Sequence, residues 1–77
     1  MKQGQFQAAE GHLREWIAID PNDPVAYNLL GIVLGERGDL SGAARAFEEA
    51  LGIDPSYQTA KNNLERVREA GALKRGS

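Results

Sequence analysis

Residues 23–55, DPVAYNLLGIVLGERGDLSGAARAFEEALGIDP, contain the pattern that decides the fold of this chain. Asp23-Pro24 is a typical start of a helix, with the aspartate as cap and the proline at the first helical position. Gly38 divides the stretch, because a glycine readily ends one helix and Asp39 or Ser41 can cap the next. Apolar and small residues recur at helical spacing on both sides of this division, at Ala26, Tyr27, Leu30, Gly31 and Leu34 and at Ala43, Ala46, Phe47, Ala50 and Leu51. The stretch therefore predicts two helices folded back on each other.

The residues before this stretch repeat its second half. Similar residues lie 34 positions apart at Gly4 and Gly38, Ala9 and Ala43, Leu13 and Phe47, Ile19 and Ile53, Asp20 and Asp54, and Pro21 and Pro55. A fixed period of this length is typical of solenoid arrays. The connections are short, so consecutive helices are expected to be antiparallel neighbours.

The spacing of the small and apolar residues also carries a family resemblance. Tyr27, Leu30, Gly31, Leu34, Ala43, Phe47, Ala50 and Pro55 match the pattern W-x2-L-G-x2-Y, A-x3-F, A, P. The chain thereby resembles the tetratricopeptide repeat family. The resemblance covers one full repeat at 23–55, and the flanks fit as the second helix of a partial repeat, 5–20, and a capping helix, 56–73. It implies an all-α fold of about four helices in one domain, 1–77, that binds other proteins or peptides.

The last predicted helix has a polar outer side. Glu65 stands where the family pattern has a small residue, and Arg68 where it has a large apolar one. Terminal units of a solenoid need such a face, so we expect this helix to cap the array. At the other end, the pattern places a further helix before Gly4, and it stays open whether these residues are a whole protein or part of a longer one.

Composition excludes several classes of function. The net charge is −2, whereas a nucleic-acid partner calls for a basic stripe. The chain has no cysteine, which excludes disulfides and permits the reducing cytosol without proving it. No apolar run approaches the roughly 20 residues that cross a bilayer, and MKQGQFQ lacks the apolar core of a signal peptide. Nucleic acid and membrane insertion are therefore not expected.

Catalytic and metal sites are not predicted either. His12 is the only histidine, and no carboxylate cluster has the spacing of metal ligands. The sequence contains no nucleophile–base arrangement and no phosphate-binding loop, because its glycines fall at turns and helix contacts. We therefore expect no enzyme activity, no metal and no cofactor.

The family resemblance implies a groove lined by the first helices of successive repeats, here the helix from Pro24 and the last helix. The residues expected to line it are Asn28, Leu29, Ile32, Glu36, Asn62, Asn63 and Arg66. Asparagine amides could bond a peptide backbone and Arg66 could hold a carboxylate, although a solvated helix face remains the plainer interpretation of each residue. The carboxylate clamp of some family members is not predicted, because matching positions hold Leu29 and Thr59.

Trp16 is unusual, because its equivalent one period later is Ala50. An indole at this position either fills space within its own chain or anchors a partner or a second copy, and the sequence leaves both open. The alternative to peptide binding is accordingly self-association through Leu13, Trp16 and Ile17, which would form a homodimer and extend the solenoid.

Overall fold

The structure is a computed structural model that describes residues 3–76, and the side chains of residues 4–72. It contains four helices: α1 (Gln3–Ile19), α2 (Pro24–Arg37), α3 (Leu40–Ile53) and α4 (Gln58–Gly76). No strand occurs in the described part of the chain, which confirms the all-α class. Residues 1, 2 and 77 of the predicted domain lie outside the described residues.

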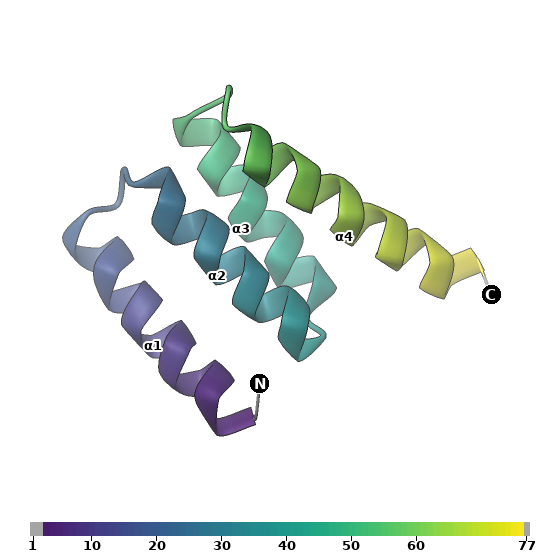
Figure 1. The fold of residues 1–77 in the computed structure, drawn as a ribbon, viewed down its shortest axis with the longest axis horizontal. Helices are drawn as coiled ribbons and strands as arrows, with labels where there is room; N and C mark the ends of the chain where they lie inside the picture. Colours follow the sequence, from purple (N-terminus) through teal and green to yellow (C-terminus); the bar gives the residue numbers. More distant parts are fainter. Residues whose placement is uncertain (1–2, 77) are drawn as a thin grey trace.

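The helices form a thin, antiparallel array (Figure 1). Its extents are 41 × 32 × 14 Å. α2 is central, since it packs against α1, α3 and α4, whereas α1 contacts only α2 among the described helices. This order places α2 between α1 and the two helices that follow it.

Both ends of α2 follow from local chemistry. The Asp23 carboxylate accepts a hydrogen bond from the Val25 N–H at 2.9 Å, and Pro24 occupies the first turn. At the other end Gly38 has a φ of 96°, a left-handed conformation that costs glycine little. The N–H groups of Gly38 and Asp39 then reach back to the Gly35 and Leu34 carbonyls, as in a Schellman motif.

The turns before α2 and α4 repeat the same chemistry one period apart. The Asp20 carboxylate accepts from the Asn22 N–H, and that of Asp54 accepts from the N–H and hydroxyl of Ser56. This bonding holds Ser56 in a turn. α4 consequently begins at Gln58, two residues later than expected.

The core lies where α2 meets its neighbours, and it consists of Leu13, Leu30, Val33, Leu34, Ala43, Ala46, Phe47 and Leu64. A Cβ added at Gly31 would stand 2.5 Å from Cε1 of Phe47, so this glycine allows α2 and α3 to approach closely. Gly4, the counterpart of Gly38, lies inside α1, and Gly38 is the only described residue with positive φ. Glu65 and Arg68 on α4 are exposed.

Candidate functional site

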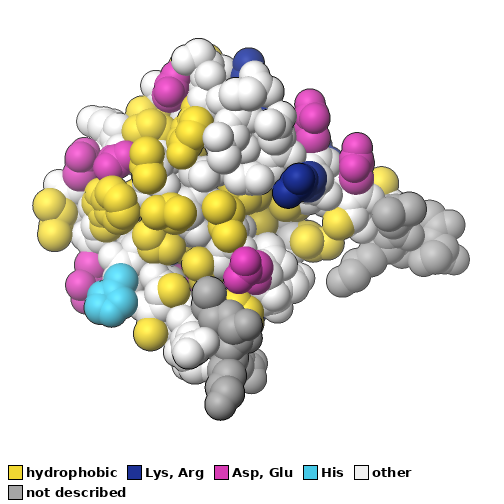
Figure 2. Space-filling model, in the orientation of Figure 1, with side chains coloured by type: hydrophobic (Ala, Val, Ile, Leu, Met, Phe, Trp, Pro, Cys, Tyr) yellow, Lys and Arg dark blue, Asp and Glu magenta, His cyan; other side chains and the backbone are white. Residues whose placement is uncertain are grey.

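Exposed apolar side chains gather on one face of the array, over α1 and α2 (Figure 2). Leu29 of α2 and Trp16 of α1 are each 38% exposed. Ile32, one turn further along α2, is half-buried and packs against the core. The side chains of α2 that face away from α3 therefore include apolar groups that the described residues leave accessible to water.

A wide hollow lies between α1 and α2, and we call it the Trp16 hollow. Its volume is about 500 Å³, and it is lined by Ala9, His12, Leu13, Trp16, Leu29, Ile32, Val33 and Glu36. Only the rim residues His12 and Glu36 are ionisable. Trp16 is thus placed at an open surface beside exposed Leu29, and it does not fill the core of its own chain.

A second hollow, the α2–α4 groove, lies on the other side of α2. Its volume is about 280 Å³, and its lining is Gly31, Ile32, Gly35, Glu36, Leu40, Phe47, Asn63, Arg66, Val67 and Ala70. Ile32 and Glu36 line both hollows. The two hollows therefore meet across α2 and form one surface, which we call the groove face.

Two of the asparagines that were expected to line the groove have other positions. Asn28 is 3% exposed, and its Oδ1 accepts a hydrogen bond from Nδ2 of Asn63 at 3.1 Å. α4 approaches α2 at this point and removes Asn28 from water, so Asn28 joins two helices and lines neither hollow. Asn62 is exposed and accepts from Gln58 within α4.

The other predicted residues are divided between the surface and the core. Leu29, Ile32, Glu36, Asn63 and Arg66 line the groove face. Of the residues predicted for self-association, Leu13 is a core residue that also lines the Trp16 hollow. Ile17 is half-buried against the core and does not line the hollow, which leaves Trp16 as the exposed member.

Charged groups connect α1 to α2 beside the hollow. The Glu10 carboxylate pairs with the Arg37 guanidinium at 2.7 Å and with that of Arg14 at 2.9 Å. In the described residues no group of three or more histidine, cysteine, aspartate or glutamate side chains could hold a metal ion. Nor is any described helix long and apolar enough to cross a membrane.

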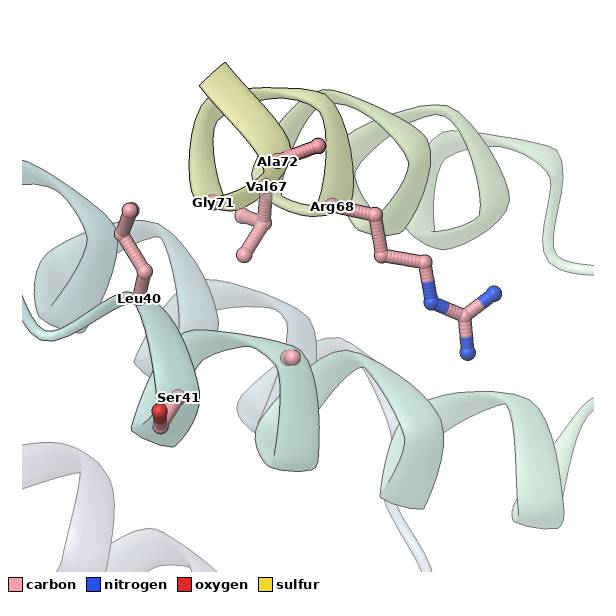
Figure 3. A pocket seen from close by; sticks show the side chains of 7 residues that line it. Leu40, Ser41, Val67, Arg68, Gly71 and Ala72 are labelled. Carbon is pink, nitrogen blue, oxygen red and sulfur yellow. The ribbon is translucent and has the colours of Figure 1, made fainter. Parts of the chain in front are cut away.

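A third hollow, between the start of α3 and the second half of α4, was not anticipated from the sequence. Leu40 and Val67 point into it, and Ser41, Arg68, Gly71 and Ala72 lie around it (Figure 3). Its volume is about 330 Å³. Small residues at Ala44 and Gly71 leave this space open, and they have no distinctive sequence signal.

Comparison with known proteins relates this chain to a repeat family and to a curated relative. Residues 12–45 match the family model described as Tetratricopeptide repeat. This window contains Trp16, all of α2 and the first turns of α3. The chain is also 38% identical over 65 residues to "Uncharacterized protein ycf37" of Pyropia yezoensis. That match covers 82% of this chain and 36% of the relative, so the chain spans about a third of the relative's length.

Proposed function

This chain belongs to the tetratricopeptide repeat family, and we propose that it binds a segment of a partner protein on its groove face. The family and the all-helical fold indicate a protein-interaction module, for which protein partners are the expected ligands.

The observation that carries this proposal is that two hollows adjoin across α2. Ile32 and Glu36 line both, and Leu29 is exposed on the same helix. Two adjoining hollows with largely apolar linings can bury a partner's apolar side chains on both sides of α2. Leu29 is 38% exposed and offers apolar area that a partner could cover, whereas Ile32 also packs against the core.

The α4 side of the groove supplies polar contacts. Arg66 is exposed at its edge and forms no hydrogen bond or ion pair with the described residues. A guanidinium in this position can hold a carboxylate of the partner in a bidentate arrangement. Asn63 already donates a hydrogen bond to Asn28. Its side chain therefore holds α4 to α2 as well as lining the groove.

Selection of peptides from a random displayed library, using the whole chain as target, tests the proposal. For the selected peptides, Leu29→Asp and Arg66→Glu should each raise the Kd by about tenfold or more, measured by calorimetry. Arg45→Glu is the matched control, because it makes the same charge change at an exposed site on α3 outside both hollows. Equal affinity for Arg66→Glu and wild type, together with unchanged binding to Leu29→Asp, would refute the proposed location.

The second candidate function is self-association through the Trp16 hollow. It is favoured by the exposure of Trp16 beside Leu29, since two such faces could cover each other. Light scattering after size exclusion, over a range of concentrations, tests it. A dimer that Trp16→Ala converts to a monomer would support this function, and a wild-type monomer at every concentration would contradict it.

A further inference from the structure

The internal repeat of the chain shows what kind of object fits the Trp16 hollow. One period later, its α1 residues correspond to Ala43, Ala46, Phe47 and Ala50 of α3, and its α2 residues to Asn63, Arg66, Val67 and Ala70 of α4. All four α3 residues are buried, because α2 lies over them. One period later an α-helix, α2, thus covers the α3 side of the equivalent space, while the four α4 residues line the α2–α4 groove beside it.

We propose that the Trp16 hollow binds an α-helix of another protein chain, antiparallel to α1 and parallel to α2, with a small apolar residue opposite Trp16 and Leu29. This inference rests on the proposed function, in that the groove face binds proteins, and it specifies the ligand of one part of that face. The lining residues that differ from their counterparts define the chemistry of the bound helix.

Leu13 determines the first requirement. Its counterpart Phe47 occupies the space where a Cβ of Gly31 would stand, so α2 needs a glycine there. The Leu13 side chain is smaller than a phenylalanine ring. A helix in the Trp16 hollow can therefore carry alanine at the position that Gly31 occupies in α2.

Trp16 and Leu29 determine the second requirement. Gly31 packs on Phe47 and Gly35 on Ala43, and this antiparallel register brings Asn28 opposite Ala50. Asn28 is buried and bonded to Asn63, whose counterpart in the hollow is Leu29. An asparagine at the same position of the bound helix would lie opposite Leu29. Leucine has no amide, so that asparagine would lack the hydrogen bond that Asn63 gives to Asn28.

An unpartnered buried amide is costly, and Trp16 takes more room than Ala50. Both effects favour alanine over asparagine at this position of the bound helix. The occupant is therefore a helix with the apolar face of α2 and alanine in place of Asn28.

The helices of a second copy do not meet these requirements. α2 is already covered by α1, α3 and α4 of its own chain. α4 is the counterpart of α2 one period later, so it is the other helix of a second copy that could take this place. Where α2 has Tyr27, Gly31 and Leu34, however, α4 has the exposed charged residues Lys61, Glu65 and Arg68. These charges would face Trp16 and Leu13, so a copy of this chain is a poorer occupant than a helix of another protein.

Two synthetic peptides test the proposal, both with the sequence of residues 23–38 followed by lysines for solubility. One keeps asparagine at the position of Asn28 and the other carries alanine. Trp16 is the only tryptophan of the chain and the peptides contain none, so its fluorescence reports binding in the hollow. We expect the alanine peptide to bind whole wild-type protein about tenfold more tightly than the asparagine peptide.

Leu29→Asn provides the matched protein variant, because it places in the hollow the amide that Asn63 supplies one period later. Leu29 is partly exposed, so the variant is expected to fold. The preference should then reverse, with the asparagine peptide bound more tightly. Circular dichroism of the mixtures should also show more helix than the sum of the separate components.

Several outcomes would overturn the proposal: no binding of either peptide, equal affinities that Leu29→Asn leaves unchanged, or binding without added helix. Binding that Arg66→Glu abolishes while Trp16 fluorescence stays constant would place the helix in the α2–α4 groove, which refutes this inference and leaves the proposed function standing. A dimer that excludes both peptides would assign the hollow to a second copy and refute it as well. If the alanine peptide binds but the displayed library yields no peptide that Leu29→Asp or Arg66→Glu weakens, the Trp16 hollow binds a helix as inferred here. The same result would contradict the proposed binding of a partner segment across the whole groove face.

Discussion

At the scale of single residues, Gly31 controls the distance between α2 and α3. A Cβ would stand 2.5 Å from Cε1 of Phe47, a core residue that is only 2% exposed, so the ring or one of the two helices would have to shift. Overpacking of this kind costs about 1–3 kcal/mol, against the roughly 1 kcal/mol by which alanine exceeds glycine in helix propensity. We therefore expect Gly31→Ala to lower the free energy of unfolding by about 1 kcal/mol, measured by urea denaturation.

Gly11→Ala is the matched control, because a Cβ at Gly11 meets no atom within 4 Å and this glycine lies in the interior of α1. Here only the helix propensity changes, so the variant should gain up to about 1 kcal/mol of stability. If both substitutions stabilised the protein equally, the close contact between Gly31 and Phe47 would be disproved.

Single residues are also where the sequence is least informative. The repeat register that the family resemblance implies placed Asn28 on the groove side of its helix, so Asn28 was expected to line the groove. Its burial depends on Asn63, 35 residues away, and on the approach of α4 to α2. For Trp16 the sequence indicated an unusual size but not its exposure, because exposure depends on which helix covers α1.

At the scale of helices, the start of α3 depends on one side chain. The sequence left Asp39 and Ser41 as alternative caps, and the structure assigns the cap to Asp39, whose Oδ1 accepts from the Gly42 N–H at 2.9 Å. We expect Asp39→Ala to lower the free energy of unfolding by about 1 kcal/mol, measured by thermal or urea unfolding. Ser41→Ala removes the other candidate and should change stability by less than about 0.5 kcal/mol. A larger loss for Ser41→Ala than for Asp39→Ala would contradict this assignment.

The helix boundaries were predictable where capping chemistry decides them. Asp23, Pro24 and Gly38 place both ends of α2, since each acts on backbone groups within a few residues. The start of α4 was less predictable, because the turn at Asp54 continues through hydrogen bonds to Ser56. Ser56 could either begin the helix or belong to the turn, and the hydrogen bonds to Asp54 show that it belongs to the turn.

At the scale of the whole molecule, the period of the sequence predicts the array of helices. It does not predict which side chains of the central helix, α2, are buried. Each helix of a solenoid contacts only near neighbours, so a 34-residue repeat is enough to predict helix order and antiparallel packing. Which residues of α2 are covered depends on three neighbouring helices at once. Val33 is buried with the core, whereas Leu29 remains exposed on the same helix, and both read as apolar in sequence.

This arrangement predicts an uneven distribution of local stability. α1 is attached through α2 alone among the described helices, whereas α2 and α3 are each packed against at least two neighbours. In a solenoid the terminal units open at a lower free energy than the interior ones. We therefore expect the backbone amides of α2 and α3 to exchange most slowly in native-state hydrogen exchange followed by NMR, and those of α1 to exchange faster.

Glu10→Gln distinguishes local opening of α1 from global unfolding. It removes the ion pairs of Glu10 with Arg37 of α2 and with Arg14 of α1, which are partly exposed and worth up to about 1 kcal/mol. If α1 opens separately, this variant should speed exchange in α1 up to about fivefold and leave α3 unchanged. Equal protection of α1 and α3 in the wild type, or equal acceleration of both in the variant, would mean that the thin array unfolds as one cooperative unit. In that case a helix bound in the Trp16 hollow would stabilise all four helices together, and not α1 and α2 first.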